Sequence, residues 1–388
     1  MSRHLSVVLY FSLIVIELKL ESRLMRILDK IKLTCLTLLL VPTLSFAQGG
    51  DGNPLHRRAG FTIPDSVLAS DVDEVMDLFE TNFNKWGMIR VEINVANASS
   101  LSLNDYNSVL ADDLSYITGT IIPTIRAHSD DIAIVVSLTT PFCDLNDNHV
   151  HDIFLDNACK QGYLASLTTI AQAIDGFVTN SGTSTDDPKL IFEVLNEAAL
   201  PVEQADTWVN MISEVNTAVR AGSTNVVTCY PPRYGNTKFL SEIKDAVVAV
   251  QGALCPHWYP ASFFQQQGAI HSTTGVTWGK AEDQKTLKKA WRKIAKVIKE
   301  YPDMRIVVTE YAVSNFAPNK SAKKFLKATH KFFKKKKNVS STFFGALGAD
   351  VWKLHQDDGN GGFELRTPQG SEVKKHLDKI TNKNGSGN

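Results

Sequence analysis

Two glutamates follow short apolar runs and carry the side chains needed for paired carboxyl chemistry. Glu197 ends the segment IFEVLNE, and Glu310 ends the segment RIVVTE. Cleavage of a glycosidic bond uses two carboxyl groups: one protonates the leaving group, and the other attacks the sugar or activates water. The two glutamates therefore predict hydrolysis of a glycosidic bond, with one carboxyl group as acid and the other as nucleophile or base. For each glutamate the alternative is a structural ion pair with a nearby basic residue.

The elements that must position these glutamates alternate along the chain. Short β-rich runs, predicted as strands, cover 58–62, 88–95, 132–138, 190–195, 226–230, 252–257, 305–309 and 344–351. Longer runs with helical periodicity cover 72–84, 163–178, 205–221, 287–300, 322–335 and 372–380. This alternation is typical of βα units on a parallel sheet. It predicts the α/β class.

Within that class the strands favour a closed barrel over an open sheet. Runs such as LIFEVL and MRIVVT are almost continuously apolar, as expected when barrel core covers one face and helices cover the other. We therefore predict a (β/α)8 TIM barrel in which Glu197 follows the fourth strand and Glu310 ends the seventh. Active sites of such barrels lie at the C-terminal ends of the strands, so both glutamates are expected at the same mouth.

Several short motifs, in order along the chain, resemble those of glycoside hydrolase family 5, the cellulase and mannanase family. The segments NKWGMIRVEINV and IFEVLNE are similar to its second-strand and acid/base motifs, with Arg90, Asn196 and Glu197 at the matching positions. CPHWYP supplies His257 and Tyr259, VVTEYAVS resembles the nucleophile motif at Glu310, and GADVWKLH resembles the eighth-strand motif at Trp352. The resemblance implies a retaining glycosidase on a single-domain barrel.

The sequence departs from the family pattern at two places beside the reaction centre. Thr139 and Thr140 stand where the third strand of the family usually ends in histidine, and Ala198 stands where proline usually follows the Asn-Glu pair. Neither position performs proton transfer or attack. The departures therefore bear on the subfamily and on contacts to the sugar.

The resemblance implies a role for each matched residue. Glu197 is expected to be the acid/base, with its pKa raised by burial and by the charge of Glu310. Glu310 is expected to be the nucleophile, kept ionised by Arg90 and Tyr259. The other expected substrate-binding residues are Asn196, toward the sugar 2-hydroxyl, His257, which orients the site, and Trp352, whose flat face suits a pyranose ring. Simple packing in the barrel is the alternative for His257 and Trp352.

More aromatic residues fall in predicted loops near the barrel mouth, where they could extend a sugar-binding surface. They are Tyr234, Trp258, Phe263, Phe264 and Trp278. Trp86, at a helix-to-strand junction, is expected to serve packing.

The predicted substrate is a β-linked oligo- or polysaccharide, with β-1,4-glucan cut internally as the first expectation. Mannan, xylan and β-1,3-glucan remain alternatives, and a catalytically silent carbohydrate-binding barrel is a remote one. Lys plus Arg and Asp plus Glu both number 41, so no net charge attracts the chain to nucleic acid. No protein partner is implied, and a monomer is expected.

No cofactor or metal is expected. Residues 144–156, DLNDNHVHDIFLD, place acidic and amide groups at alternate positions as a calcium loop does. However, His149 occupies the position that needs glycine, and Leu155 occupies the position of the bidentate glutamate. His149 and His151 alone do not make a zinc ligand set.

The N-terminal region carries an export signal. From Met25 a basic stretch precedes an apolar run over 33–44 and the small-residue pattern Ser45-Phe46-Ala47, which is the order of a signal peptide. Residues 25–47 are thus the predicted signal and 48–388 the mature barrel, secreted or periplasmic. Residues 1–24 are read as an upstream extension, with a membrane anchor as the alternative.

Export makes disulfides possible for the four remaining cysteines. Cys143 and Cys159 lie at the two ends of one polar segment and are expected to be bridged. Cys229 and Cys255 lie in or near predicted strands, where small buried thiols are the simpler expectation.

We predict that the exported protein begins near Gln48, because the signal pattern ends at Ala47. N-terminal sequencing of the exported protein checks this. A mature chain that still begins before residue 25 would show that the first apolar run is an anchor.

Overall fold

The computed structural model describes residues 58–63, 72–82, 86–143, 151–178, 190–345, 352, 354–357 and 363–384. The chain divides into two compact units: Met1–Asn53 lies outside the described residues, and Pro54–Asn388 contains all of them. The upstream extension, the predicted signal 25–47 and residues 144–150 of the loop considered for calcium also lie outside them.

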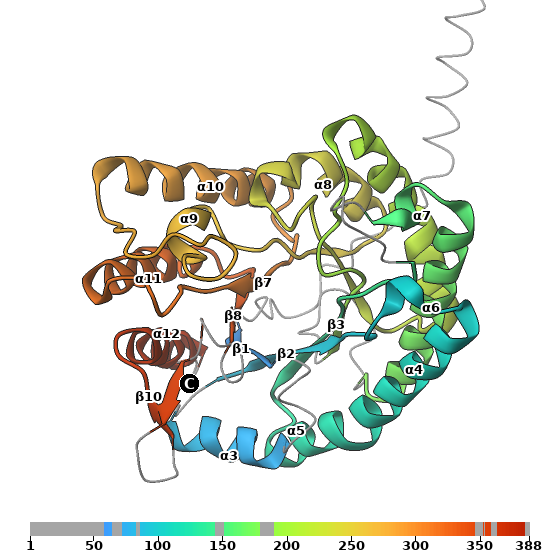
Figure 1. Ribbon diagram of the computed structural model, residues 1–388, viewed down its shortest axis with the longest axis horizontal. Helices are drawn as coiled ribbons and strands as arrows, with labels where there is room; N and C mark the ends of the chain where they lie inside the picture. Colours follow the sequence, from blue (N-terminus) through green and yellow to red (C-terminus); the bar gives the residue numbers. More distant parts are fainter. Residues whose placement is uncertain are drawn as a thin grey trace, which may run out of the picture. The chain divides into compact units, whose positions relative to one another are not determined.

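The described strands form a closed, all-parallel barrel in which each strand pairs with its neighbours in chain order and β1 pairs with β8 (Figure 1). The strands are β1 Ala59–Ile63, β2 Met88–Ile93, β3 Ala133–Leu138, β4 Leu190–Glu193, β5 Val227–Tyr230, β6 Ala253–Leu254, β7 Ile306–Tyr311 and β8 Val339–Phe344. The predicted (β/α)8 barrel is confirmed.

Helices surround these strands (Figure 1). They are α3 Val72–Asn82, α4 Leu103–Tyr116, α5 Ile122–His128, α6 Asn157–Asp175, α7 Ala205–Gly222, α8 Leu240–Ala249, α9 Ser262–Gln265, α10 Ala281–Glu300, α11 Asn319–Phe333 and α12 Gln369–Asn384. A small antiparallel pair, β9 His355–Asp357 and β10 Phe363–Leu365, precedes α12. Among the described residues, no helix has both the length and the apolar character needed to cross a bilayer.

Local sequence explains why these helices form and which face they bury. In α10 the apolar residues Leu287, Trp291, Ile294 and Ile298 recur every three or four positions and are all buried. Helix α6 begins at a capping residue, Asp156, whose carboxylate accepts a hydrogen bond from the backbone N–H of Cys159.

The strands separate two apolar cores. The larger core lies between the strands and the helices. A smaller core fills the inside of the barrel and consists of Met88, Ala133, Val135, Ile191, Cys229, Ala253, Cys255 and Val307. On β2, β3, β4 and β7 the next inward side chain toward the C-terminal end is polar and buried: Arg90, Ser137, Glu193 and Thr309. The barrel interior therefore changes from apolar to polar along the strands.

The eighth strand lies earlier in the chain than the sequence predicts. The prediction placed it at 344–351, whereas β8 is Val339–Phe344; residues 346–351 lie outside the described residues. The difference arises because Ser340, Ser341 and Thr342 are polar yet buried. Two of these hydroxyls bind backbone groups of neighbouring segments: Ser340 accepts from the backbone N–H of Arg58, and Thr342 donates to the carbonyl of Thr309. A strand with polar residues at these buried positions is not recognised as an apolar run in the sequence.

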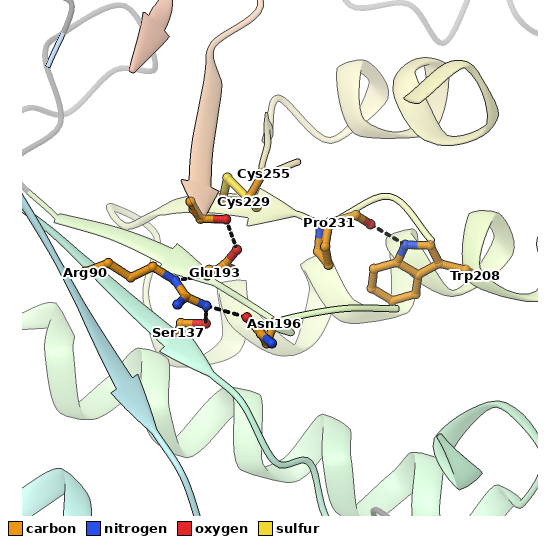
Figure 2. The surroundings of a disulfide bond; sticks show 9 residues. Arg90, Ser137, Glu193, Asn196, Trp208, Cys229, Pro231 and Cys255 are labelled. Atoms are coloured by element: carbon orange, nitrogen blue, oxygen red, sulfur yellow. Dashed lines mark hydrogen bonds and ion pairs between the residues drawn. A yellow bond between two sulfur atoms is a disulfide. The ribbon is translucent and has the colours of Figure 1, made fainter. Parts of the chain in front are cut away.

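Two disulfides are present. Cys143–Cys159 closes the segment between β3 and α6, with Cα atoms 5.4 Å apart, and confirms the prediction. The expectation of free thiols at Cys229 and Cys255 is wrong, since these two are also bridged (Figure 2). Cys229 pairs with Ala253 across β5 and β6, and Cys255 follows two residues later on the same inward face. Only the strand pairing reveals that the two side chains are neighbours.

We predict that replacing Cys143 and Cys159 together by serine lowers the free energy of unfolding by about 3 kcal/mol, because the bridge restricts a loop of 16 residues in the unfolded chain. Urea unfolding of both proteins, each with Cys229–Cys255 intact, measures the difference. Equal free energies of unfolding would show that this bridge adds no stability.

Candidate active site

The centre of the polar layer is Arg90 on β2, which is fully buried. Its Nε donates to Glu193 Oε2 at 2.7 Å, and its Nη2 donates to Ser137 Oγ at 2.9 Å and to Asn196 Oδ1 (Figure 2). Its Nη1 donates to Glu92 Oε1 at 2.6 Å and lies 3.2 Å from Glu310 Oε1. One guanidinium thus joins side chains from β2, β3, β4, the segment after β4, and β7.

Glu310 reaches this cluster through an irregularity in β7. The pairing of β7 with β8 shifts register between Val308 and Tyr311. Val307 belongs to the inner core and Val308 to the outer core, as alternation requires. Thr309 then points inward and donates to Glu193 Oε1 at 2.6 Å, while Tyr311 packs in the outer core. The shift therefore turns two consecutive side chains, Thr309 and Glu310, toward the interior.

Glu197 and Glu310 meet at one imidazole nitrogen. Nδ1 of His257 lies 2.8 Å from Glu197 Oε1 and 3.5 Å from Glu310 Oε2. The two carboxylate oxygens are therefore closer together than the sum of these distances. That sum is below the separation of roughly 6.5 to 9.5 Å seen in inverting glycosidases. The separation of these two oxygens therefore lies below the inverting range, as expected for a retaining enzyme.

The loop after β5 fixes His257. Asn236 and His257 form a parallel bridge, and the backbone N–H of His257 donates to the carbonyl of Gly235 at 2.7 Å. Gly235 has a φ of 60°, and a Cβ there would lie only 2.6 Å from the imidazole Cγ. Glycine is needed for both reasons.

Comparison with known proteins decides the family. The family model described as Cellulase (glycosyl hydrolase family 5) matches residues 127–347, which is more than half of the 388 residues. The chain belongs to glycosyl hydrolase family 5. It is accordingly an O-glycosyl hydrolase that acts by the retaining, double-displacement reaction. No curated protein matches it significantly.

Solved structures show the same fold as this family 5 chain. The Thermotoga maritima Cel5A complex with cellobiose is 16% identical, with a TM-score of 0.61 and coverage of 83% of this chain and 97% of that one. Cellulose synthase subunit Z from Clostridioides difficile is 18% identical, with a TM-score of 0.59 and coverage of 83% and 99%. A broad-specificity endoglucanase from an uncultured bovine rumen ciliate is 12% identical, with a TM-score of 0.56 and coverage of 81% and 86%.

The electrostatics of the family 5 site differ from those expected from sequence. Burial raises the pKa of Glu310 to about 7, although the charges of His257 and Arg90 oppose this. Burial also disfavours the ionised form of Glu197, but the hydrogen bond and charge of His257 outweigh it and lower the pKa of Glu197. The expected directions were the opposite. They change because burial outweighs the nearby cations at Glu310, whereas the hydrogen bond and charge of His257 outweigh burial at Glu197.

Burial disfavours the charged forms of His257 and Arg90 as well, but the surrounding carboxylates keep both cationic. The charge of Glu310 and the hydrogen bond to Glu197 raise the pKa of His257 to about 9. The charges of Glu193, Glu92 and Glu310 raise the pKa of Arg90.

The other predicted residues are placed as follows. The hydroxyl of Tyr259 donates to Glu310 Oε2 across 3.5 Å, and burial together with the nearby carboxylates raises the pKa of that hydroxyl. Trp352 is held through different contacts: its ring packs edge-on against Phe344, and its indole N–H donates to the carbonyl of Gln265. The structure thus joins Arg90, Asn196, Glu197, His257, Tyr259 and Glu310 in one network, whereas Trp352 is fixed by the loop that contains α9.

The loop aromatics divide into two groups. Trp258, Phe264 and Trp278 are buried in the core, so they cannot form a surface for sugar. Tyr234 and Phe263 are exposed, and the ring of Phe263 stacks on that of His271 at 4.3 Å. Trp86 packs against Phe79, as expected.

Sequence reasoning missed Ser137 and Thr309, which bind Arg90 and Glu193, and three further residues of the site. Glu92 and Glu193 lie on the inward face of their strands, two positions after Arg90 and four before Glu197, so strand alternation could have indicated both. His151, considered only for zinc, places Nε2 2.7 Å from the backbone carbonyl of Glu197. No pattern in the sequence indicates that contact.

Among the described residues, Asp77, Glu80 and His128 place ligand atoms within 4.8 Å of one another. His128 already pairs with Glu80 at 2.7 Å, and both acidic side chains are exposed. Exposed carboxylates commonly cluster without a metal, so this group is not assigned as a metal site.

Proposed function

We propose that this family 5 enzyme cleaves β-1,4-glucan internally, with Glu310 as nucleophile and Glu197 as acid/base. The observation that carries the assignment of residues is the contact of both carboxylates with one nitrogen of His257 in a retaining-family barrel. The substrate class is supported by the structures that share this fold, which include endoglucanases and a complex with cellobiose.

In the first step Glu310 attacks the anomeric carbon while the glycosidic oxygen receives a proton from Glu197. Glu197 and His257 share this proton, since Nδ1 of His257 lies 2.8 Å from Glu197 Oε1. In the part of the chain that the structure describes, Nε2 of His257 is buried without a hydrogen-bond partner. Because Nδ1 is the nitrogen that faces Glu197, the Nδ1 proton is the one that passes to Glu197, and the imidazole is then neutral with its remaining proton on Nε2.

In the second step Glu197 removes a proton from water, which then attacks the glycosyl ester. Ester formation neutralises Glu310, whose charge is a main cause of the raised pKa of His257. The imidazole is then more readily neutral, and Glu197 is left as an ionised base. Hydrolysis of the ester restores the carboxylate of Glu310 and returns the proton to the pair.

Asn196 is assigned to the sugar 2-hydroxyl. Its Oδ1 accepts from Arg90, so the amide NH₂ is the group that remains to donate to the substrate. A hydrogen bond at this hydroxyl strengthens in the oxocarbenium-like transition state.

Export to the periplasm or the outside of the cell belongs to the same proposal. It is supported by the signal pattern over 25–47 and by the two disulfides, which persist in oxidising compartments.

Substrate choice is tested by reducing-sugar release from carboxymethylcellulose, mixed β-glucan, mannan, xylan and β-1,3-glucan. We expect the fastest release from carboxymethylcellulose, with internal cuts that lower its viscosity early. Mannan is the informative competitor, because Thermotoga maritima Cel5A has also been solved with mannotriose. Faster release from mannan would replace glucan in the proposal.

The residue roles predict distinct mutant stereochemistry. Glu310→Ala should lose turnover by several orders of magnitude and recover part of it with azide, giving a product of inverted configuration. Glu197→Ala should still react with substrates that have good leaving groups, and azide should then give a product of retained configuration. NMR of the first-formed products checks both. The opposite pattern would mean that the two roles are exchanged.

The pKa values predict a bell-shaped pH profile of kcat/KM. The nucleophile must be ionised, so activity should rise with pH through about 7 as Glu310 loses its proton. Activity should fall above about 9, where the pair of His257 and Glu197 loses the proton needed by the leaving group. An acid limb at the ordinary pKa of glutamate, roughly 4, would contradict the assignment of this limb to Glu310 with a raised pKa.

A further inference from the structure

Glu92 is a third carboxylate beside the two glutamates assigned to the reaction. It lies on β2 two residues after Arg90, so both side chains point into the barrel. Its side chain is 11% exposed, about as little as that of Glu310 at 10%. The mechanism proposed above gives it no task.

Glu92 and Glu310 compete for the same nitrogen of Arg90. Nη1 lies 2.6 Å from Glu92 Oε1 and 3.2 Å from Glu310 Oε1. The remaining donors of the guanidinium are engaged elsewhere: Nε binds Glu193, and Nη2 binds Ser137 and Asn196. Nη1 carries two N–H groups and can face both carboxylates, but it is held closer to Glu92, so a shorter contact with Glu310 would lengthen the contact with Glu92.

Resting on the assignment of Glu310 as nucleophile, we propose that Glu92 is a positioning residue that withholds Arg90 from Glu310 and so sets the pH at which the nucleophile becomes ionised. The charge of Glu92 acts in the same direction, because it lies close enough to Glu310 to disfavour a second negative charge there.

The other charged groups around Glu92 and Glu310 do not replace Glu92 in holding Nη1 of Arg90. They are Arg90 on β2, Glu193 on β4, Glu197 after β4, His151 near Glu197, and His257 and Tyr259 after β6. Glu193 is a fully buried counterion for Arg90, with Thr309 as a second partner. Arg90 therefore does not need Glu92 as its counterion, which argues against a purely structural role.

The test is the pH profile of kcat/KM for Glu92→Gln, a change that removes the charge and weakens the hold on Nη1. Arg90 is then free to bind Glu310 more closely, and the acid limb should move to lower pH by about one unit, since a nearby opposite charge lowers a carboxyl pKa by this order. Well below the limb, the activity relative to the plateau should rise about tenfold. Glu92→Asp keeps the charge but shortens the side chain, so a smaller shift in the same direction is expected.

Glu242→Gln is the matched control. Glu242 pairs with Arg233 at 2.7 Å, away from the catalytic network, and its loss should leave the acid limb in place. Thermal unfolding of each variant shows whether it is folded. An acid limb that stays in place or moves to higher pH in folded Glu92→Gln would overturn the proposal. If that variant does not fold, an unmoved limb in Glu92→Asp would overturn it.

The same measurements separate this inference from the function on which it rests. A Glu310→Ala variant that azide does not rescue would show that Glu310 was assigned wrongly. A normal wild-type limb that Glu92→Gln does not move contradicts the role of Glu92 alone.

Discussion

The active site depends on the buried guanidinium of Arg90. A charge removed from water is stable only when its donors have acceptors of good geometry, and here the acceptors come from neighbouring elements around the barrel. Because the acceptors lie on different strands, moving β3 or β4 relative to β2 would leave a buried donor of Arg90 unsatisfied. Arg90 therefore fixes the positions of Asn196 and Glu310 at the same time as its acceptors fix Arg90.

The balance of charges in this cluster explains why the site still holds a proton near pH 7. Two cations, Arg90 and His257, face four carboxylates: Glu92, Glu193, Glu197 and Glu310. With all six groups charged, the buried site would carry excess negative charge, which low dielectric makes costly. Protons that stay bound to the cluster reduce this excess negative charge, and the six groups titrate together rather than one by one. A bound proton of this kind is what an acid catalyst must supply.

The sequence predicts most of the fold and the two glutamates, because both depend on patterns local in the chain. Apolar strands covered on both faces identify seven strands closely, and a glutamate that ends a strand lies at the rim of any parallel barrel. The eighth strand fails this criterion because Ser340, Ser341 and Thr342 are polar but buried, with the hydroxyls of Ser340 and Thr342 bonded to backbone groups. The Cys229–Cys255 bridge and the contact of His151 with Glu197 depend on strand pairing and loop path, which no local pattern records.

Local sequence patterns also fail to predict the direction of the pKa shifts, which depends on distances between single atoms. Sequence comparison correctly brings Arg90 and Glu310 into one site, and from that pairing alone a low pKa for Glu310 follows. The structure reverses it, because burial of Glu310 outweighs the opposing charges of His257 and Arg90, and the charge of Glu92 acts in the same direction as burial. The irregularity in β7 decides which oxygens Arg90 can reach, since a regular strand would face Glu310 away from the interior when Thr309 faces inward. Ionisation of Glu310, the proposed nucleophile, is thus affected by a backbone feature of β7 and by the neighbouring carboxylate Glu92 of β2.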